Sequence, residues 1–91
     1  MTETHIVKRK GHKEKFDEKK VYGSIYAACY VVHEKEVECE KTADSVTKHV
    51  KKWIKNKKVV SSENISKLVT KELKKHNKHA AFMYETHRDL S

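Results

Sequence analysis

The stretch HIVKRKGHKEKFDEKKV, residues 5–21, decides how the chain begins to fold. It opens with three residues suited to a short strand, and Gly11 then offers a tight turn because glycine readily takes positive φ. The residues up to Phe16 can return as a second strand, so we expect a β-hairpin over about residues 5–16. A single hairpin this short is marginally stable in water, which means that it must pack against another element.

A helix is predicted directly after the hairpin. Asp17 suits an N-cap, because its carboxylate can accept hydrogen bonds from the free backbone N–H groups of a first helical turn. Apolar residues then recur at helical spacing, and tyrosines four residues apart add a second stripe. We therefore expect a helix over about residues 18–33 with both stripes largely buried. The first stripe is Val21, Ile25, Ala28, Cys29 and Val32, and the second is Tyr22, Tyr26 and Tyr30.

The rest of the chain carries three further helical patterns. The first covers about residues 36–56, with an apolar face opposite a face of lysines. A serine pair followed by Glu63 is typical of a helix start and introduces a helix over about residues 62–76. The last pattern covers about residues 78–90.

These patterns predict an α+β, mostly helical fold, with an N-terminal hairpin followed by a cluster of about four helices. Val59 and Val60 are expected to form an apolar connection into the third helix, and His87 is expected to face the core from the fourth. A length of 91 residues suggests a single domain over residues 1–91. The absence of proline and the presence of only two glycines argue against a long flexible linker.

The formal net charge of the chain is +8, and most of it comes from lysine. One interpretation is a polyanionic partner: a nucleotide, a nucleic acid or an acidic protein surface. The alternative is a soluble, lysine-rich surface without a specific partner, which the interleaved acidic residues favour in the middle of the chain. The sequence has no apolar leader and no apolar run long enough to span a membrane, so we expect a cytoplasmic protein.

Cations and carboxylates alternate around the predicted hairpin. Lys8 and Arg9 precede the turn, and Lys20 lies in the first turn of the predicted helix, where free N–H groups and the helix dipole also attract anions. These groups suit a phosphate, although simple surface charge explains them as well. Glu14 and Asp17 could accept hydrogen bonds from the exocyclic amine of adenine, or they could pair with the neighbouring cations. The segment therefore fits a nucleotide whose two ends are bound by groups of different charge.

Metal binding and catalysis are not expected. His76-x-x-His79 has ligand-like spacing, but it lies across a predicted helix break and lacks a nearby cysteine pair. Cys29 and Cys39 are too few for a disulfide scaffold, and Cys29 falls in an apolar stretch as a core residue would. No GxxxxGK[ST] phosphate loop and no GxSxG motif occurs, so we expect a protein that is not an enzyme.

Three segments of the chain together resemble the ATP-cone family. VKRKGHKEKFDEKKVYGSIYAAC, residues 7–29, is similar to the opening of these domains, whose usual form is KR-x-G-x-x-E-x-F-D-x-x-K-[IV] running into a helix. VVSSENISKLVTKEL, residues 59–73, resembles the third-helix segment, and HRDL, residues 87–90, resembles the closing Tyr-Arg-Asp-Phe. The segments follow in the family's order over nearly the whole chain.

The resemblance implies a hairpin with a four-helix cluster that binds ATP or dATP, with or without Mg²⁺, and that regulates rather than catalyses. Such domains usually precede ribonucleotide reductases or stand beside a zinc ribbon in a repressor of their genes. There they sense adenine nucleotide and alter the oligomeric state, so self-association or a partner protein is also expected. The nucleotide-binding residues that the resemblance implies are Lys8, Arg9, Glu14, Asp17, Lys20, Val21, Ser62, Ile65, Ser66 and Arg88.

The chain departs from the family pattern at three positions. Ser66 stands where many members have histidine, Phe82 replaces an arginine of the last helix, and His87 replaces the closing tyrosine. Loss of a direct charged contact to phosphate would cost about 1.5–3 kcal/mol, unless another cation such as Lys71 or Lys78 replaces it. A small basic module that interacts with nucleic acid or protein, and that has lost strong nucleotide binding, is therefore the alternative function. No catalytic domain or zinc ribbon follows, so we expect a free-standing cone, with an excised domain as the alternative.

Overall fold

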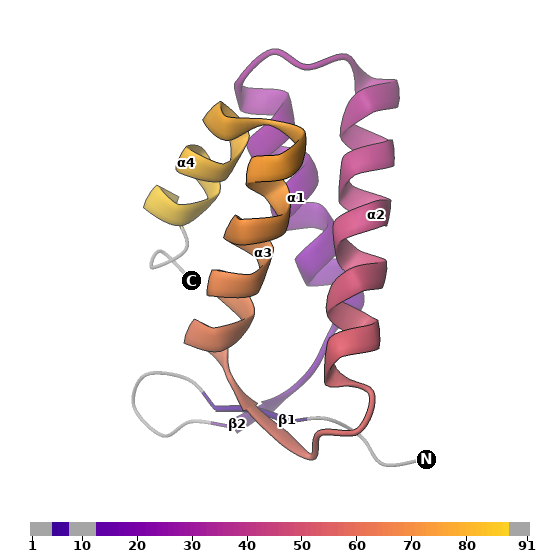
Figure 1. Cartoon of the computed structure of the whole chain (residues 1–91), viewed down its shortest axis with the longest axis vertical. Coiled ribbons are helices and arrows are strands. Elements are labelled where there is room, and N and C mark those ends of the chain that lie inside the picture. Colours follow the sequence, from indigo (N-terminus) through magenta and orange to yellow (C-terminus); the bar gives the residue numbers. More distant parts are fainter. Residues whose placement is uncertain (1–4, 8–12, 88–91) are drawn as a thin grey trace.

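A small sheet lies at one end of four helices in the computed structural model, which describes residues 5–7 and 13–87 (Figure 1). The molecule is elongated, with principal extents of 35 × 26 × 18 Å. The first three helices run along the longest of these axes, and the sheet crosses their ends. The α+β, mostly helical fold class is confirmed.

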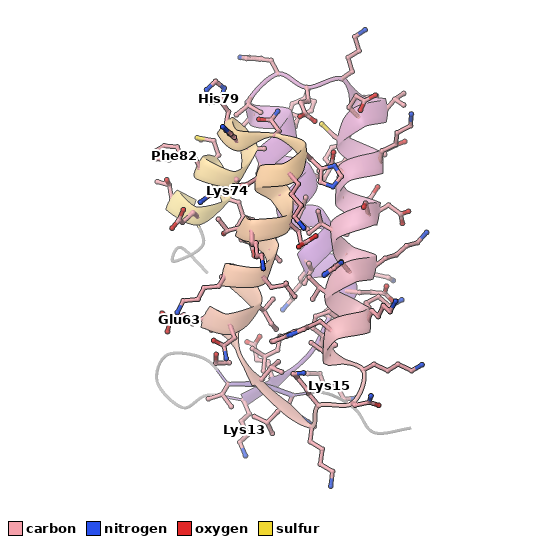
Figure 2. The ribbon with its side chains drawn as sticks, in the orientation of Figure 1. Lys13, Lys15, Glu63, Lys74, His79 and Phe82 are labelled. Atoms are coloured by element: carbon pink, nitrogen blue, oxygen red, sulfur yellow. The ribbon has the colours of Figure 1, made fainter. Side chains whose placement is uncertain are left out.

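The predicted hairpin is present. β1 (His5–Val7) pairs antiparallel with β2 (Lys13–Lys15). Successive side chains of a strand point to opposite faces, and in β2 the two lysines are exposed whereas Glu14 between them is half-buried. The lysines of β2 therefore lie on the solvent side of the sheet (Figure 2).

The expectation of an apolar connection before the third helix is wrong, because Val59 and Val60 belong to a strand. β3 (Val59–Ser61) pairs parallel with β1, which gives the strand order β2-β1-β3. Val60 lies beside Ile6 and is buried, whereas Val59 on the other face is 51% exposed. An apolar side chain at Val60 is explained by the core beneath that face of the strand, whereas Val59 faces away from it.

α1 (Glu18–Val31) follows β2 almost directly. Asp17 caps it as predicted: a carboxylate oxygen of Asp17 accepts a hydrogen bond of 2.9 Å from the backbone N–H of Lys19. α2 (Glu36–Ile54) runs back towards the sheet and ends slightly before the predicted boundary.

The second half of the chain adds α3 (Ser62–His76) and α4 (Lys78–His87). Ser61 at the end of β3 caps α3, because its Oγ accepts a 3.0 Å hydrogen bond from the backbone N–H of Asn64. Asn77 separates the two helices and caps α4 with its side-chain oxygen, to which the N–H of Ala80 donates at 3.0 Å.

Two parts of the predicted fourth helix cannot be compared with the structure. Residues 88–90, and the side chain of His87, lie outside the described residues.

All four helices contribute to one hydrophobic core. α1 packs on α2 and α4, and α3 packs on α4 and α2. Half-buried residues of the sheet, including Ile6, close the core at its lower end. The buried apolar residues are Ile25, Ala28, Cys29, Cys39, Ala43, Val46, Val50, Ile54, Val60, Ile65, Val69, Leu73, Ala80 and Ala81.

The tyrosine stripe of α1 is less buried than predicted. Tyr22 and Tyr26 are half-buried, but Tyr30 is 58% exposed, so the prediction is wrong for that residue. The rings stack along the helix with centroids 6.4 Å apart in both successive pairs. Tyr30 lies in the last turn of α1 and packs on its own stripe rather than in the core.

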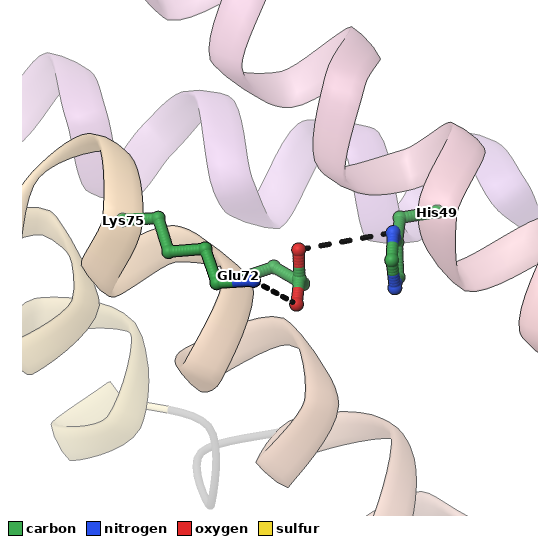
Figure 3. A network of polar contacts seen from close by, with 3 residues as sticks. All are labelled: His49, Glu72 and Lys75. Atoms are coloured by element: carbon green, nitrogen blue, oxygen red, sulfur yellow. Dashed lines mark hydrogen bonds and ion pairs between the residues drawn. The ribbon is translucent and has the colours of Figure 1, made fainter.

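A polar contact joins α2 to α3 above the sheet (Figure 3). The carboxylate of Glu72, whose side chain is only 13% exposed, lies 3.7 Å from Nδ1 of His49 and 3.3 Å from Nζ of Lys75. Figure 3 shows Glu72 between the two nitrogens, with one oxygen turned to each.

Within the described residues, no helix is both long enough and apolar enough to cross a membrane.

Candidate functional site

The two carboxylates that were predicted to bind adenine lie on consecutive elements. Glu14 is at the centre of β2 and half-buried, and Asp17 stands exposed at the start of α1. One oxygen of Asp17 accepts the hydrogen bond from the N–H of Lys19. A carboxylate offers about four acceptor sites, so Asp17 can cap the helix and still accept a hydrogen bond from a ligand.

The first turn of α1 has fewer free N–H groups than the sequence suggests. The N–H of Lys19 is bonded to the side chain of Asp17, and those of Lys20 and Val21 are bonded to its carbonyl oxygen at 3.2 and 3.3 Å. A phosphate at this end of α1 would therefore be bound mainly by side chains. Lys20 is exposed and available to such a phosphate, while Val21 is half-buried against the core.

The predicted site residues of α3 share one face of the helix. Ser62, Ile65 and Ser66 are separated by three and four positions, which places them side by side. Ser62 and Ser66 are half-buried, but Ile65 is only 5% exposed and packs in the core. On this face of α3, the hydroxyl groups of the two serines are therefore the groups that a ligand could contact, and Ile65 is not.

The sheet connects the two halves of the candidate site. β1 lies between β2, which carries Glu14, and β3, which leads into Ser62. Neighbouring strands are about 4.8 Å apart, so the backbones of β2 and β3 are separated by about 10 Å. Figure 1 shows that α1 and α3 both begin at this sheet. One ligand of nucleotide size can span that separation.

Three of the predicted site residues lie outside the part of the chain that the structure describes. Lys8 and Arg9 directly follow Val7, which pairs with Ser61 on one side and Lys13 on the other, but they themselves lie outside the described residues. Arg88 lies outside them as well.

Phe82 occupies the outer surface of α4. Its side chain is 65% exposed, and Figure 2 shows it at the edge of the molecule. Phe82, where the resemblance leads us to expect an arginine, is therefore not part of the core. Lys71 and Lys78, which could replace that cation, are also exposed.

The structure also brings together three side chains that the sequence did not predict to lie close to one another. Cys29, Glu34 and Cys39 each offer a ligand atom, and these atoms all lie within 4.8 Å of one another. Burial raises the pKa of the Cys29 thiol to about 12, and the charge of Glu34 acts in the same direction. Burial likewise raises the pKa of Cys39. By contrast, both histidines of the His76-x-x-His79 pattern are exposed.

The signal for this group was weak in the sequence. The two cysteines are ten positions apart, on two helices, and Glu34 lies in the connection between those helices. Only the turn between α1 and α2 brings the three together.

The comparison with known families agrees with this architecture. The family model described as the ATP cone domain matches residues 4–89, and no curated protein matches the chain. The match includes the hairpin, all four helices and every predicted site residue. The chain therefore belongs to the ATP cone domain family, whose domains are regulatory and bind nucleotides.

Proposed function

We propose that this chain is a non-catalytic regulatory module that binds ATP or dATP at the sheet end of the molecule. In this proposal the nucleotide changes the way the module associates with itself or with a partner protein. Control of the activity or the expression of a ribonucleotide reductase is the process that the family suggests.

The observation that supports the proposal most is the three-stranded sheet. β3 brings the start of α3 to the hairpin, so that Glu14 and Asp17 stand on one side of β1 and Ser62 on the other. The carboxylates can accept hydrogen bonds from the adenine amine, and a serine hydroxyl can donate to a phosphate. Lys8 and Arg9, which follow β1 in the sequence, would supply the charge that a triphosphate needs.

A nucleotide titration tests the proposal directly. ATP, dATP, GTP and plain triphosphate are added separately to the isotope-labelled chain and followed by NMR. We expect saturable shifts at Glu14, Asp17, Lys20 and Ser62 with ATP or dATP, and weaker effects with GTP, because its base lacks the adenine amine. If ATP at millimolar concentration produces no saturable shift in these residues, the proposal is wrong.

A double variant tests the phosphate contacts. Lys8→Ala with Arg9→Ala should weaken ATP binding at least tenfold, because each charge-assisted contact contributes about 1.5–3 kcal/mol. Lys41→Ala with Lys74→Ala is the matched control: it removes the same net charge from exposed helical positions away from the sheet. Circular dichroism should show unchanged helix content in both. Equal weakening in the two variants would mean that only net charge matters.

The exposed Phe82, together with the net charge of +8, favours a second candidate function. A chain that has exchanged a phosphate-binding arginine for an exposed aromatic ring could bind nucleic acid or protein instead. Charge-driven binding to DNA weakens steeply as salt rises. This function would be favoured over the first if the chain binds DNA with a sequence preference at moderate salt and does not bind ATP.

A further inference from the structure

The connection between α1 and α2 folds back under the last turn of α1. His33 takes a φ of 66°, and its backbone N–H donates to the carbonyl of Tyr30 at 3.0 Å. The N–H of Glu34 donates to the carbonyl of Cys29 at 3.2 Å. This pair of hydrogen bonds is the Schellman motif. Its effect is to return the side chain of Glu34 to the level of Cys29, where α2 supplies Cys39.

Three donor atoms converge at this turn. The sulfur atoms of Cys29 and Cys39 and a carboxylate oxygen of Glu34 lie within 4.8 Å of one another. Both cysteine side chains are fully buried. The donors come from the end of α1, the turn and the start of α2, so the local backbone fixes their relative positions.

The carboxylate of Glu34 is held in place by one of its oxygens only. Oε1 accepts a hydrogen bond from Nδ2 of Asn77, the residue that also caps α4. Oε2 is buried and accepts no hydrogen bond of ordinary geometry among the described residues. The thiol of Cys29 interacts with this carboxylate, but it is a weak donor, and the interaction adds to burial in raising the pKa of the thiol. A buried carboxylate oxygen without a hydrogen bond of ordinary geometry is costly, and a bound cation is the natural partner for it beside two sulfur atoms.

We propose that Cys29, Cys39 and Glu34 form a binding site for one zinc(II) ion. Two thiolates and a carboxylate are zinc ligands, with Zn–S distances of about 2.3 Å and Zn–O distances of about 2.0–2.2 Å. Tetrahedral geometry at these lengths separates two sulfur ligands by about 3.8 Å. The donors already lie within 4.8 Å, so side-chain adjustments of about 1 Å close the site around an ion.

Water can supply the fourth ligand. An open hollow lined by Tyr30, Val31, His33 and Glu34 lies at the same turn, so solvent comes close to the site although Oε2 of Glu34 itself is buried. On binding, each thiol releases its proton to water and its sulfur bonds to the ion as thiolate. Asn77 acts as a positioning residue, because its hydrogen bond orients the carboxylate without contacting the ion.

The same cysteines could instead form a disulfide, but this alternative explains less of the structure. A disulfide joins only the two sulfur atoms and leaves the buried oxygen of Glu34 without a partner. A cation satisfies all three groups at once. The zinc site is also independent of the nucleotide proposal, because it shares no residue with it.

Metal titration of the complete, untagged and reduced chain tests this site. Cobalt(II) serves as the spectroscopic probe, and zinc(II) is then added to displace it. We expect one cobalt ion per chain, with the intense near-ultraviolet absorption of thiolate-to-cobalt charge transfer, and its loss when zinc is added. Failure to bind cobalt or zinc, or binding without the charge-transfer band, overturns the proposal.

Substitutions identify the ligands. Cys29→Ala and Cys39→Ala should each abolish the charge-transfer band or reduce it by half, and Glu34→Gln should weaken zinc binding at least tenfold. Glu36→Gln, at an exposed position two residues away, is the matched control and should leave affinity unchanged. His76→Ala with His79→Ala should likewise have no effect. Zinc binding that survives all three ligand substitutions but is lost with the histidines overturns the site.

A measurement on the unaltered chain covers the case in which a cysteine variant does not fold. Zinc should raise the melting temperature, and it should protect both cysteines from alkylation when the products are counted by mass spectrometry. If zinc protects neither cysteine, the proposal is wrong. Formation of a Cys29–Cys39 disulfide by a mild oxidant, in a chain that takes up no zinc when reduced, identifies a redox pair and also overturns it.

Discussion

The side chain of Asp17 has a structural role, which the hydrogen bond from Lys19 shows, and a proposed role in nucleotide binding. Its carboxylate caps α1 through the N–H of Lys19, and it is also predicted to accept a hydrogen bond from adenine. These roles require different things of the residue. Capping needs only a side-chain oxygen close enough to accept a backbone N–H of the first turn. A hydrogen bond from adenine needs an oxygen that also extends towards the ligand.

The two roles of Asp17 can therefore be separated by substitution. Asp17→Ser keeps a capping oxygen, so the free energy of unfolding should change by no more than about 0.5 kcal/mol. Asp17→Ala removes the cap and should cost about 1 kcal/mol. Both should weaken ATP binding about fivefold to tenfold, the value of one hydrogen bond of about 1 kcal/mol. Urea denaturation and calorimetric titration measure the two effects, and an unchanged ATP affinity in Asp17→Ser would exclude the adenine contact.

At the scale of the element, β3 is the strand that joins the start of α3 to the hairpin, and the sequence did not predict it. It is only three residues long, and it exists because β1 lies beside it. Its two valines face opposite sides of the sheet, with Val60 in the core and Val59 towards solvent. This contrast within one strand offers a matched pair of substitutions.

Val60→Ala should destabilise the protein by about 2 kcal/mol, because it removes two buried methyl groups and leaves part of their volume empty. Val59→Ala changes the same residue type in the same strand and should cost less than about 0.5 kcal/mol. For a domain of this size, 1 kcal/mol corresponds to about 4–8 °C in melting temperature. Similar melting temperatures for the two variants would contradict the placement of Val60 in the core.

The elements that could be predicted are those with local causes. The caps at Asp17 and Ser61, the pairing of β1 with β2 and the helical periodicity all depend on residues close to one another in the sequence. The turn predicted at Gly11 lies outside the described residues. β3 depends on a partner strand from the start of the chain, and the exposure of Tyr30 depends on how the other helices pack against the end of α1. Neither cause can be seen in a short stretch of sequence.

The same distinction applies to the sites. The predicted nucleotide residues around Asp17 form one continuous segment, and the family pattern gives them their register. The group of Cys29, Glu34 and Cys39 depends on the left-handed backbone at His33. Histidine is not the usual residue at such a position, so the turn that assembles the group had no clear sequence signal.

At the scale of the whole molecule, the two proposed sites lie at opposite ends. The sheet and the starts of α1 and α3 are at one end of the long axis, and the α1–α2 connection is at the other (Figure 1). The long axis measures 35 Å. The core between them is continuous, but no described residue belongs to both sites.

We therefore expect zinc and nucleotide to bind independently. The dissociation constant of ATP should change by less than twofold when zinc saturates its site, and Cys39→Ala should leave the ATP affinity unchanged in a chain that remains folded. Calorimetric titration with and without zinc measures this. A coupling of tenfold or more would correspond to about 1.4 kcal/mol and would show that the core transmits strain between the ends.

The parallel pairing of β1 with β3 has a consequence for the order in which the molecule forms. α1 and α2 are neighbours in the chain and can pack early, whereas β1 must wait for a strand from the second half of the sequence. Contacts between distant residues carry a larger entropic cost of loop closure and tend to form late. Val60→Ala should then accelerate unfolding while leaving the refolding rate almost unchanged in stopped-flow experiments. The proposed nucleotide site would then be among the last parts of the protein to assemble, so on this proposal a nascent chain could not bind ATP before α3 had been made.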